Sequence, residues 1–246
     1  MPRFFIRQER VCGENVSIIG EDAHHIARSL RMAVGDEITV CDMQGNEYSC
    51  EIESFDEDRE VVAKIMSQRH SENEPKLYIR LFQALPKGDK LDTIIQKAVE
   101  CGASEIIPFQ SERCVVKIKN DAEDRKNDRR RKISAEAAKQ CGRSVIPDVK
   151  NAVSFDEAIA MAAESELCLF CYEGDGTVPL GQILRGREEL PTTVSIVIGS
   201  EGGFSVKEVE RAKEKGAVLA GLGKRILRTE TASGFVLACL VCASEL

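Results

Sequence analysis

The stretch IGSEGGFS, residues 198–205, places three glycines and one glutamate directly after an apolar run at 194–197. Glycine adopts backbone angles that other residues avoid, and it lets a ligand touch the main chain. A helical pattern follows, and the free N–H groups at a helix start favour ligand binding. Because Glu201 disfavours a bare phosphate, we expect a neutral or cationic ligand here. A tight strand-to-helix turn without a ligand is the structural alternative.

A second loop of the same kind is LGKRILRTETA, residues 222–232, which also follows an apolar run and opens a helical pattern. It carries a cation, Arg228, and a carboxylate, Glu230. If the two strands are neighbours, the loops at their ends form one shared pocket. Neither loop contains G-x-G-x-x-G or G-x-x-x-x-G-K-[ST], so the dinucleotide and P-loop signatures do not apply.

These loops need a scaffold, and the first part of the chain predicts mostly short strands. Strand patterns at 3–6, 37–40, 48–52 and 61–65 are separated by turn signals, with one helical piece at 24–32. The segment 71–75 is polar, turn-prone and closed by proline, which marks a boundary. This part indicates a β-barrel of about 70 residues, near the lower size for independent folding.

After the boundary, strands and helices alternate. Strands are predicted at 77–81, 106–107, 167–172, 194–198 and 218–222, and helices at 91–99, through the basic region to 142, at 206–212 and from 231 onward. Ser205 followed by Glu208 is a capping-box signature for one of these helices. Such alternation predicts a mostly parallel sheet covered by helices, with ligands at the carboxyl ends of its strands.

The charge of the chain is unevenly distributed. A formal charge of −7 argues mildly against a nucleic-acid partner. Residues 51–60 are predominantly acidic, however, whereas residues 117–143 hold ten Lys or Arg against five Asp or Glu, including four consecutive cations at 129–132. This basic segment is either a phosphate-contacting surface or a solvated helix face.

The composition favours a cytoplasmic protein without membrane association or metal. No apolar segment follows the first residues, and the longest apolar run, 235–243, is too short to span a bilayer. The ten cysteines form no secreted-domain framework, which indicates reduced thiols. The C-x-x-C pairs at 168–171 and 239–242 lie in apolar patterns, so we expect structural cysteines. His24 and His25 are adjacent and would point apart on a helix, which makes them a poor metal pair.

The two glycine loops resemble the cofactor loops of the SPOUT RNA methyltransferases, in particular of the 16S rRNA (uracil-N3)-methyltransferase family. Further motifs resemble the same family in the same order: HHIARSLR at 24–31, IIQKAVECGASEIIPFQSERC at 94–114 and EAAKQCGRSVIP at 136–147. The resemblance covers nearly the whole chain. The family usually has proline where Ser200 stands, a difference that we expect to bear on cofactor affinity rather than on activity.

The resemblance implies an α/β fold with two domains. A small PUA-like β-barrel that binds RNA would occupy residues 1–72, and a trefoil-knotted SPOUT methyltransferase domain with a mostly parallel sheet would occupy 73–246. The patterning itself does not indicate a knot, which is rare in proteins. Homodimers are usual in the family, and the apolar helix at 232–243 could form part of the interface or pack as a core helix.

The resemblance also implies the cofactor S-adenosylmethionine, held largely by main-chain groups of three loops. The residues implied to bind it are Tyr172, Glu173, Ile198, Gly199, Glu201, Gly202, Gly203, Leu222, Gly223, Ile226, Leu227 and Thr231.

The implied reaction is methylation of N3 of one uridine in 16S rRNA, within the small ribosomal subunit. N3 lies on the Watson–Crick edge, so the base must be unpaired or turned out. N3 is also a weak acid that must lose its proton, and a cation near the uracil oxygens would stabilise the resulting anion. We assign this catalytic role to Arg228. Glu230 is either the proton acceptor or a partner that orients Arg228.

The resemblance further suggests which residues face the RNA. These are Arg3, His25, Arg28, Arg31, Arg113, Gln140 and Arg143. The helix at 24–31 could instead plug the barrel, and a single arginine is more often a surface or salt-bridge residue. Three other functions stay open: a non-catalytic RNA-binding module, a small-molecule methyltransferase or nucleotide enzyme, and a SPOUT methyltransferase with a different RNA target.

Overall fold

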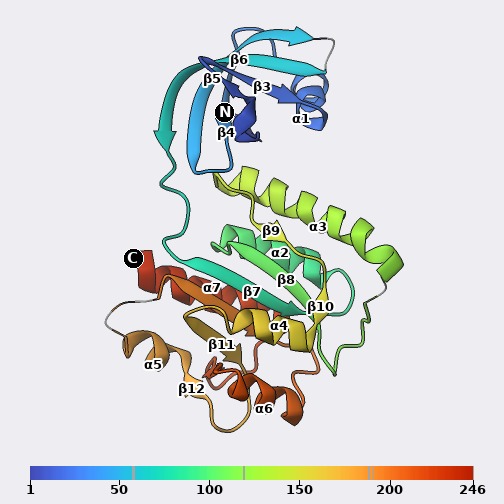
Figure 1. Cartoon of the computed structure of the whole chain (residues 1–246), viewed down its shortest axis with the longest axis vertical. Helices are drawn as coiled ribbons and strands as arrows, with labels where there is room; N and C mark the ends of the chain where they lie inside the picture. The colour runs from blue at the N-terminus through green and yellow to red at the C-terminus, as the bar shows by residue number, and fades with distance from the viewer. Residues whose placement is uncertain (57–58, 119, 188, 190, 246) are drawn as a thin grey trace. The chain divides into compact units, whose positions relative to one another are not determined.

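The computed structural model describes residues 1–56, 59–118, 120–187, 189 and 191–245 (Figure 1). Two acidic residues of the segment 51–60, at positions 57 and 58, and one basic residue of the segment 117–143, at position 119, lie outside the described residues. The chain divides into two compact units. The first comprises Met1–Glu74 and Ala138–Ile146, and the second comprises Pro75–Ala137 and Pro147–Leu246.

The first unit is built on a six-stranded sheet of order β1-β4-β5-β6-β3-β2. Its strands are β1 (Arg3–Phe5), β2 (Val11–Cys12), β3 (Asn15–Ile19), β4 (Glu37–Cys41), β5 (Asn46–Asp56) and β6 (Glu60–His70). Neighbouring strands are antiparallel except β1 and β4, which are parallel. Alternating apolar residues of these strands, among them Phe4, Ile18 and Ile38, form one buried core.

A helical segment connects β3 to β4. Helix α1 (Glu21–His24) continues as a single π-helical turn, η2 (His25–Ser29), and a 3-10 turn, η1 (Gln8–Arg10), precedes β2. The prediction of a helix at 24–32 is therefore wrong at both ends. Helical structure begins after Gly20 and stops before Arg31, whose φ of 53° is incompatible with a helix.

The second unit contains a parallel sheet of order β10-β8-β7-β13-β11-β14-β12, in which β9 also pairs with β8. Its strands are β7 (Tyr78–Ala84), β8 (Glu105–Gln110), β9 (Asp148–Val149), β10 (Val153–Ser154), β11 (Leu167–Cys171), β12 (Val178–Pro179), β13 (Thr193–Ile198) and β14 (Val218–Gly221). The helices are α2 (Lys90–Glu100), α4 (Phe155–Ala162), α5 (Leu180–Arg185), α6 (Val206–Glu214), α7 (Thr229–Glu245) and the larger part of α3 (Asn120–Cys141), whose last residues from 138 belong to the first unit.

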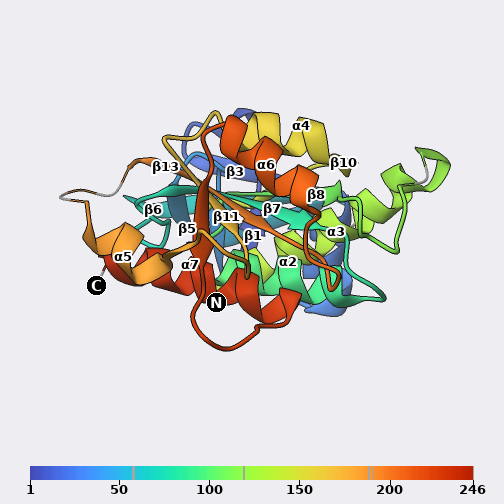
Figure 2. The same ribbon diagram turned by 90° about the horizontal axis from the view of Figure 1, so that it is seen from below.

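Helices cover both faces of this sheet. Figure 2 shows α2 and α7 on one face and α4 and α6 on the other. The central strands are consequently buried on both sides, which explains their continuous apolar sequences: every residue of β11 is buried. The predicted mostly parallel, helix-covered sheet is confirmed.

The sheet register brings the glycine loops to one edge. In β13, Ile198 pairs with Gln83 of β7 and Val197 pairs with Phe170 of β11, and all three strands are parallel. β14 pairs in parallel with β11, which lies between β13 and β14, so the prediction that the glycine loops follow neighbouring strands is wrong. The segments that follow β7, β11, β13 and β14 therefore start from the same, carboxyl-terminal edge of the sheet.

Candidate functional site

A pocket of about 670 Å³ lies at this edge of the sheet, within the range of roughly 300–1,000 Å³ that is typical of small-molecule sites. Its wall contains most residues predicted to bind a cofactor: Tyr172, Glu173, Ile198, Gly199, Glu201, Gly202, Gly203, Leu222, Gly223, Ile226 and Leu227. Arg228 also lines it. Glu230 and Thr231, in the first turn of α7, are not part of this wall.

The first glycine loop is a tight turn, and a different structural constraint favours glycine at each of its three glycine positions. Gly203 donates its N–H to the carbonyl of Ser200 at 2.9 Å and has a φ of 63°, which glycine adopts at low cost. A Cβ on Gly199 would meet the ring of Phe204 at 3.1 Å, and a Cβ on Gly202 would meet Arg113 at 3.0 Å. The turn is therefore too closely packed for larger side chains at these two positions.

Phe204 anchors this loop to the domain interior. Its ring lies 4.2 Å from that of Phe170, measured between centroids, and it is 3% exposed. The next residue, Ser205, caps helix α6 through the predicted capping box with Glu208. Glu208 also accepts a hydrogen bond from the Glu112 N–H at 2.8 Å. Glycines beside a buried aromatic and a capped helix make a rigid wall.

Thr229 ties the second loop to the first, and no sequence pattern indicated this. Its hydroxyl donates to the carbonyl of Gly199 at 2.6 Å and accepts from the side-chain amide of Gln83 at 2.9 Å. Both side chains are buried. Since Gln83 lies near the end of β7, three segments distant in sequence are fixed to one another at the pocket.

Three charged side chains meet beside the pocket. Lys90 Nζ lies 2.8 Å from Oε1 of Glu201 and 3.5 Å from Oε2 of Glu230. Burial raises the pKa of Glu201, but hydrogen bonds from Lys90 and from main-chain N–H groups outweigh burial, and the pKa lies below its ordinary value. The pKa of Lys90 is raised, chiefly by its hydrogen bond to Glu201. Glu201 is thus an ionised carboxylate that already has a cationic partner.

Arg228 has no comparable partner. Its side chain is exposed and lines the pocket, and no described residue forms an ion pair or side-chain hydrogen bond with it. Its carbonyl accepts from the N–H groups of Thr231 and Ala232 at the start of α7. The ion pair recorded for Glu230 is with Lys90, so no contact supports the alternative in which Glu230 orients Arg228.

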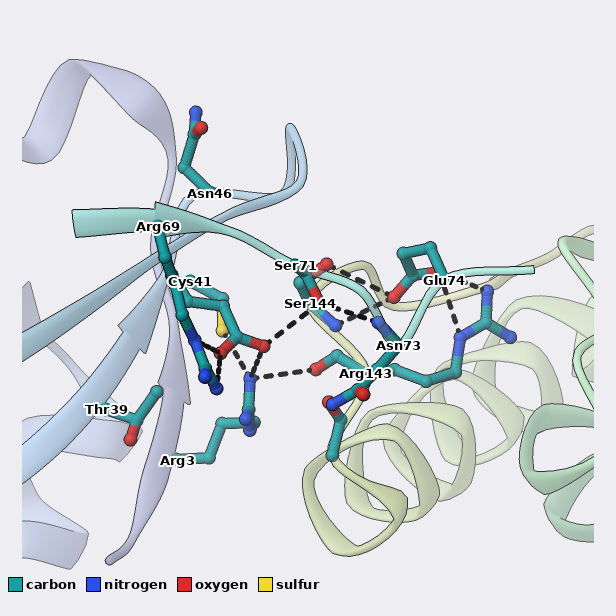
Figure 3. A network of polar contacts seen from close by, with 12 residues as sticks. Arg3, Thr39, Cys41, Asn46, Arg69, Ser71, Asn73, Glu74, Arg143 and Ser144 are labelled. Carbon is teal, nitrogen blue, oxygen red and sulfur yellow. Dashed lines mark hydrogen bonds and ion pairs between the residues drawn. The ribbon is translucent and has the colours of Figure 1, made fainter. Parts of the chain in front are cut away.

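Two of the residues predicted to face RNA, Arg3 and Arg143, belong instead to a polar network inside the first unit (Figure 3). Arg3 donates to Glu47 at 2.7 Å and to the carbonyl of Arg143 at 3.4 Å. Arg143 donates through Nη2 and Nε to Oε2 of Glu74, at 2.7 and 3.1 Å. The arginine side chains are 13% and 6% exposed. Because both guanidinium groups are engaged and nearly buried, their role here is structural.

The two glutamates hold this network together. Glu47 also accepts from Arg69 at 2.8 Å and from Ser71 at 3.1 Å, and Glu74 accepts from the Ser144 N–H at 2.8 Å. Burial raises the pKa of each carboxyl, but the arginine contacts outweigh burial and lower the pKa of both. The network joins the strands of the first unit to the segment that follows α3.

The other predicted RNA-facing residues are exposed, although their contact with RNA stays a prediction. They are His25, Arg28, Arg31, Gln140 and Arg113. In the helical segment 21–29, Ala23 and Ile26 pack into the core while the polar residues point outward, so one face plugs the core and the other is accessible. Arg113 packs against Gly202 and donates to its carbonyl at 3.2 Å, which places it in the pocket wall.

The basic helix α3 also divides into two kinds of arginine. Arg130 pairs with Glu123 at 2.5 Å, and both side chains are less than 10% exposed. Arg129 and Arg131 are 68% and 51% exposed, although Arg129 also pairs with Asp92 at 2.6 Å and Arg131 lies 3.8 Å from Asp148. Neither a phosphate-contacting surface nor a solvated helix face therefore describes Arg130, since its charge is neutralised in the interior.

The first C-x-x-C pair packs in the interior, whereas Cys242 of the second pair is exposed. Cys168 and Cys171 are buried in β11, and burial raises the pKa of Cys168 to about 12. Among the described residues, no group of three or more His, Cys, Asp or Glu side chains is placed to hold a metal ion. No helix in the described ranges is long and apolar enough to cross a membrane.

Comparison with known proteins agrees with this architecture. An RNA methyltransferase domain model matches residues 72–241, and an RNA methyltransferase PUA domain model matches residues 18–66. The ribosomal RNA small subunit methyltransferase E of Bacillus subtilis is 36% identical over 252 aligned residues, which cover 100% of this chain and 98% of that protein.

Two solved structures are similar over nearly the whole chain. The small subunit methyltransferase E of Neisseria gonorrhoeae, bound to S-adenosylmethionine, is 30% identical with a TM-score of 0.84, and the match covers 98% of this chain and 96% of that chain. A methyltransferase of Legionella pneumophila in complex with the same cofactor is 31% identical with a TM-score of 0.85, over 98% and 97% of the two chains.

The parallel sheet, the paired glycine loops and these similarities define an α/β methyltransferase of the knotted SPOUT class with a PUA-like amino-terminal unit, which confirms the predicted fold class. The chain belongs to the RNA methyltransferase family, in the branch of the small subunit rRNA methyltransferases E. The prediction of an enzyme is confirmed with it.

Proposed function

We propose that this protein transfers a methyl group from S-adenosylmethionine to N3 of one uridine in the 16S rRNA of the small ribosomal subunit. The single observation that carries the proposal is Arg228, an exposed cation without a side-chain partner among the described residues, at a pocket walled by glycine loops. A base that loses its N3 proton becomes an anion, and a free cation at the reaction site stabilises it.

The residues of the pocket fit S-adenosylmethionine. Open space of at least 4 Å surrounds the position that a Cβ would take on Gly203 and on Gly223, so the main chain there is accessible to a ligand. The buried hydroxyl of Ser200 has no hydrogen-bond partner among the described residues and belongs to the same wall. Main-chain groups of 198–203 and 222–227, with Tyr172 and Glu173, would hold the cofactor. When bound, S-adenosylmethionine supplies an activated methyl group on a positively charged sulfur.

The chain's own residues then have two tasks at the uracil. Arg228 would hold the uracil oxygens and stabilise the negative charge that develops on deprotonation. Glu230 would accept the N3 proton: its Oε2 is buried without a hydrogen bond from a described residue, and its one ion pair, with Lys90 at 3.5 Å, is long. Holding the base in line with the methyl donor contributes much of the rate enhancement.

We also propose two partners, the rRNA and a second copy of this chain. The exposed residues His25, Arg28, Arg31 and Gln140, with Arg129 and Arg131 of α3, would contact rRNA phosphates.

A homodimer would use the outer face of α7, where Phe235 is 42% exposed and Cys242 is exposed, while Ala232, Val236 and Leu240 of the same helix are buried. We place the enzyme in the cytoplasm, with assembling or mature small subunits.

Mass spectrometry of nucleosides tests the proposal. Small subunits from a strain that lacks the gene should contain no N3-methyluridine in 16S rRNA, and incubation with the purified protein and S-adenosylmethionine should restore it. Unchanged N3-methyluridine in the deleted strain would refute the proposed reaction. If the protein methylates a different position instead, the proposed methyltransferase activity would stand and the proposed target would be wrong.

A further inference from the structure

Lys90 connects the two cofactor loops, although it belongs to neither. It is the first residue of α2, and its ammonium lies within 3.5 Å of a carboxylate oxygen from each loop region, Glu201 in the first and Glu230 at the start of α7. It also lines the pocket. Its side chain is 33% exposed, so this contact is accessible to a ligand rather than sealed in the core.

The two carboxylates have few other partners. Glu201 accepts main-chain hydrogen bonds from Lys87 at 3.3 Å, and Oε2 of Glu230 is buried without a hydrogen bond from any described residue. One ammonium therefore balances two acidic groups, and the cluster keeps a net charge of about −1 while both carboxylates are ionised. Removing Lys90 would make the net charge of this cluster more negative, whereas removing a cation that does not contact Glu201 or Glu230 would leave it unchanged.

We propose that Lys90 is a positioning residue that sets the negative charge presented to the cofactor, and that this charge determines how strongly the pocket distinguishes S-adenosylmethionine from S-adenosylhomocysteine. The cofactor carries a positive sulfur, and the product that remains after methyl transfer is neutral there. A carboxylate near the site therefore attracts the cofactor more than the product, and Lys90 moderates this attraction while it holds both carboxylates in place.

The test compares the affinities of the two ligands by calorimetry, without RNA, at pH 8. Lys90→Met should raise the ratio of cofactor affinity to product affinity about fivefold, as expected for one unit charge across a partly solvated pocket. Lys90→Arg keeps the charge and should leave the ratio unchanged. Lys90→Met combined with Glu201→Gln restores the net charge and should return the ratio close to that of the wild type.

Lys87→Met is the matched control. It removes the same charge three residues earlier, but only the main chain of Lys87, and not its side chain, touches Glu201. The proposal predicts no change in its ratio. A purely structural role for Lys90 would weaken both ligands equally and leave the ratio constant, which would overturn the proposal. An equal change of the ratio in Lys87→Met would overturn it too, because the effect would then come from the loss of any nearby positive charge and not from the contact of Lys90 with the two carboxylates.

A thermal melt accompanies each variant, and Lys90→Gln replaces Lys90→Met if the latter does not fold. The inference rests on the proposed cofactor, but not on the uridine that is methylated. If neither ligand binds the wild type, the proposed function fails. If both bind and the ratio is insensitive to Lys90, only this inference fails.

Discussion

The cofactor pocket of the second unit and the polar network of the first unit use arginine in opposite ways. In the network, Arg143 is 6% exposed and donates twice to Glu74, so its charge is balanced inside the protein. At the pocket, Arg228 is exposed and no described residue neutralises it. Both arginines match motifs of the same family, and only their partners separate a structural role from a chemical one.

This difference shows what the folded structure adds to a motif. A buried, fully hydrogen-bonded charge pair specifies how segments meet, and removing one partner leaves an uncompensated charge. An unpaired cation at a pocket costs little in stability because water solvates it, and it is available to a ligand. We therefore expect substitutions in the network to change stability, and substitutions in the pocket to change binding and rate.

The largest effect on cofactor binding is expected from a glycine of the pocket. Gly203→Val places a branched side chain at a φ of 63°, in open space that the ligand would occupy. We expect roughly a hundredfold loss of S-adenosylmethionine affinity by calorimetry, because a β-branched residue is strained there and fills the site. Gly216→Val carries a similar strain at a φ of 84° outside the pocket wall and is the control. Equal losses in both variants would remove the loop from the site.

Substitutions in the polar network of the first unit should lower stability rather than cofactor affinity. Arg143→Ala leaves the carboxylate of Glu74 without its cation, and we expect the free energy of unfolding to fall by about 2 kcal/mol. The melting temperature should drop by about 4–8 °C for a chain of this size. Arg69→Ala removes an arginine that is 73% exposed and should cost less than about 1 kcal/mol. A stable Arg143→Ala protein with reduced RNA binding would show that our structural assignment is wrong.

Helix α3 contains one buried arginine and two exposed arginines that form surface ion pairs, and it sharpens the comparison. Replacing Arg129 and Arg131 with glutamine should weaken binding to small subunits and reduce its salt slope by about 1 to 2, because exposed cations release counterions. Arg130→Gln should instead lower the melting temperature, since it breaks the buried pair with Glu123. An unchanged salt slope in the double variant would make this face of the helix a solvated surface only.

The smallest effect concerns pH. The pKa of Glu74 is lowered in the folded protein: burial opposes the shift, and Arg143 and main-chain N–H groups outweigh it. A carboxyl whose pKa is lowered on folding stabilises the folded protein at pH values above its ordinary pKa of 4.5. This contribution is lost as the pH falls through the pKa of the folded state. The melting temperature of the wild type should therefore exceed that of Glu74→Gln at pH 7, and this difference should shrink below pH 4.5. A constant difference down to pH 3.5 would contradict this role.

Much of the fold follows from local sequence signals. Continuous apolar runs predicted the central strands, and the serine–glutamate spacing at 205 and 208 predicted the capped start of α6. The same spacing at Ser154 and Glu157 caps α4, a helix that the sequence reading missed although the signal was present. Strand β3 was also missed, because its five residues offer only a brief alternation.

The pocket was predictable only in part, for a physical reason. Glycines after two strands indicated the loops, because strand ends of a parallel sheet meet at one edge. The contacts that shape the site join residues far apart in sequence, such as Thr229 with Gln83 and Lys90 with Glu201. Such pairs leave no periodic signal. For the same reason the burial of Arg3 and Arg143 could not be predicted, since their partners come from distant segments.

Single-turnover methylation of small subunits by Arg228→Ala, with saturating S-adenosylmethionine, tests the central claim most directly. The unpaired arginine is assigned to the uracil anion, so the rate should fall by roughly 10² to 10³ while the melting temperature and cofactor affinity stay close to wild type. Arg228→Lys should recover little, because lysine lacks the planar fork that can hold two oxygens. Arg143→Ala, assayed below its melting temperature, should methylate at close to the wild-type rate. A near-wild-type rate in a destabilised Arg228→Ala protein would contradict the account.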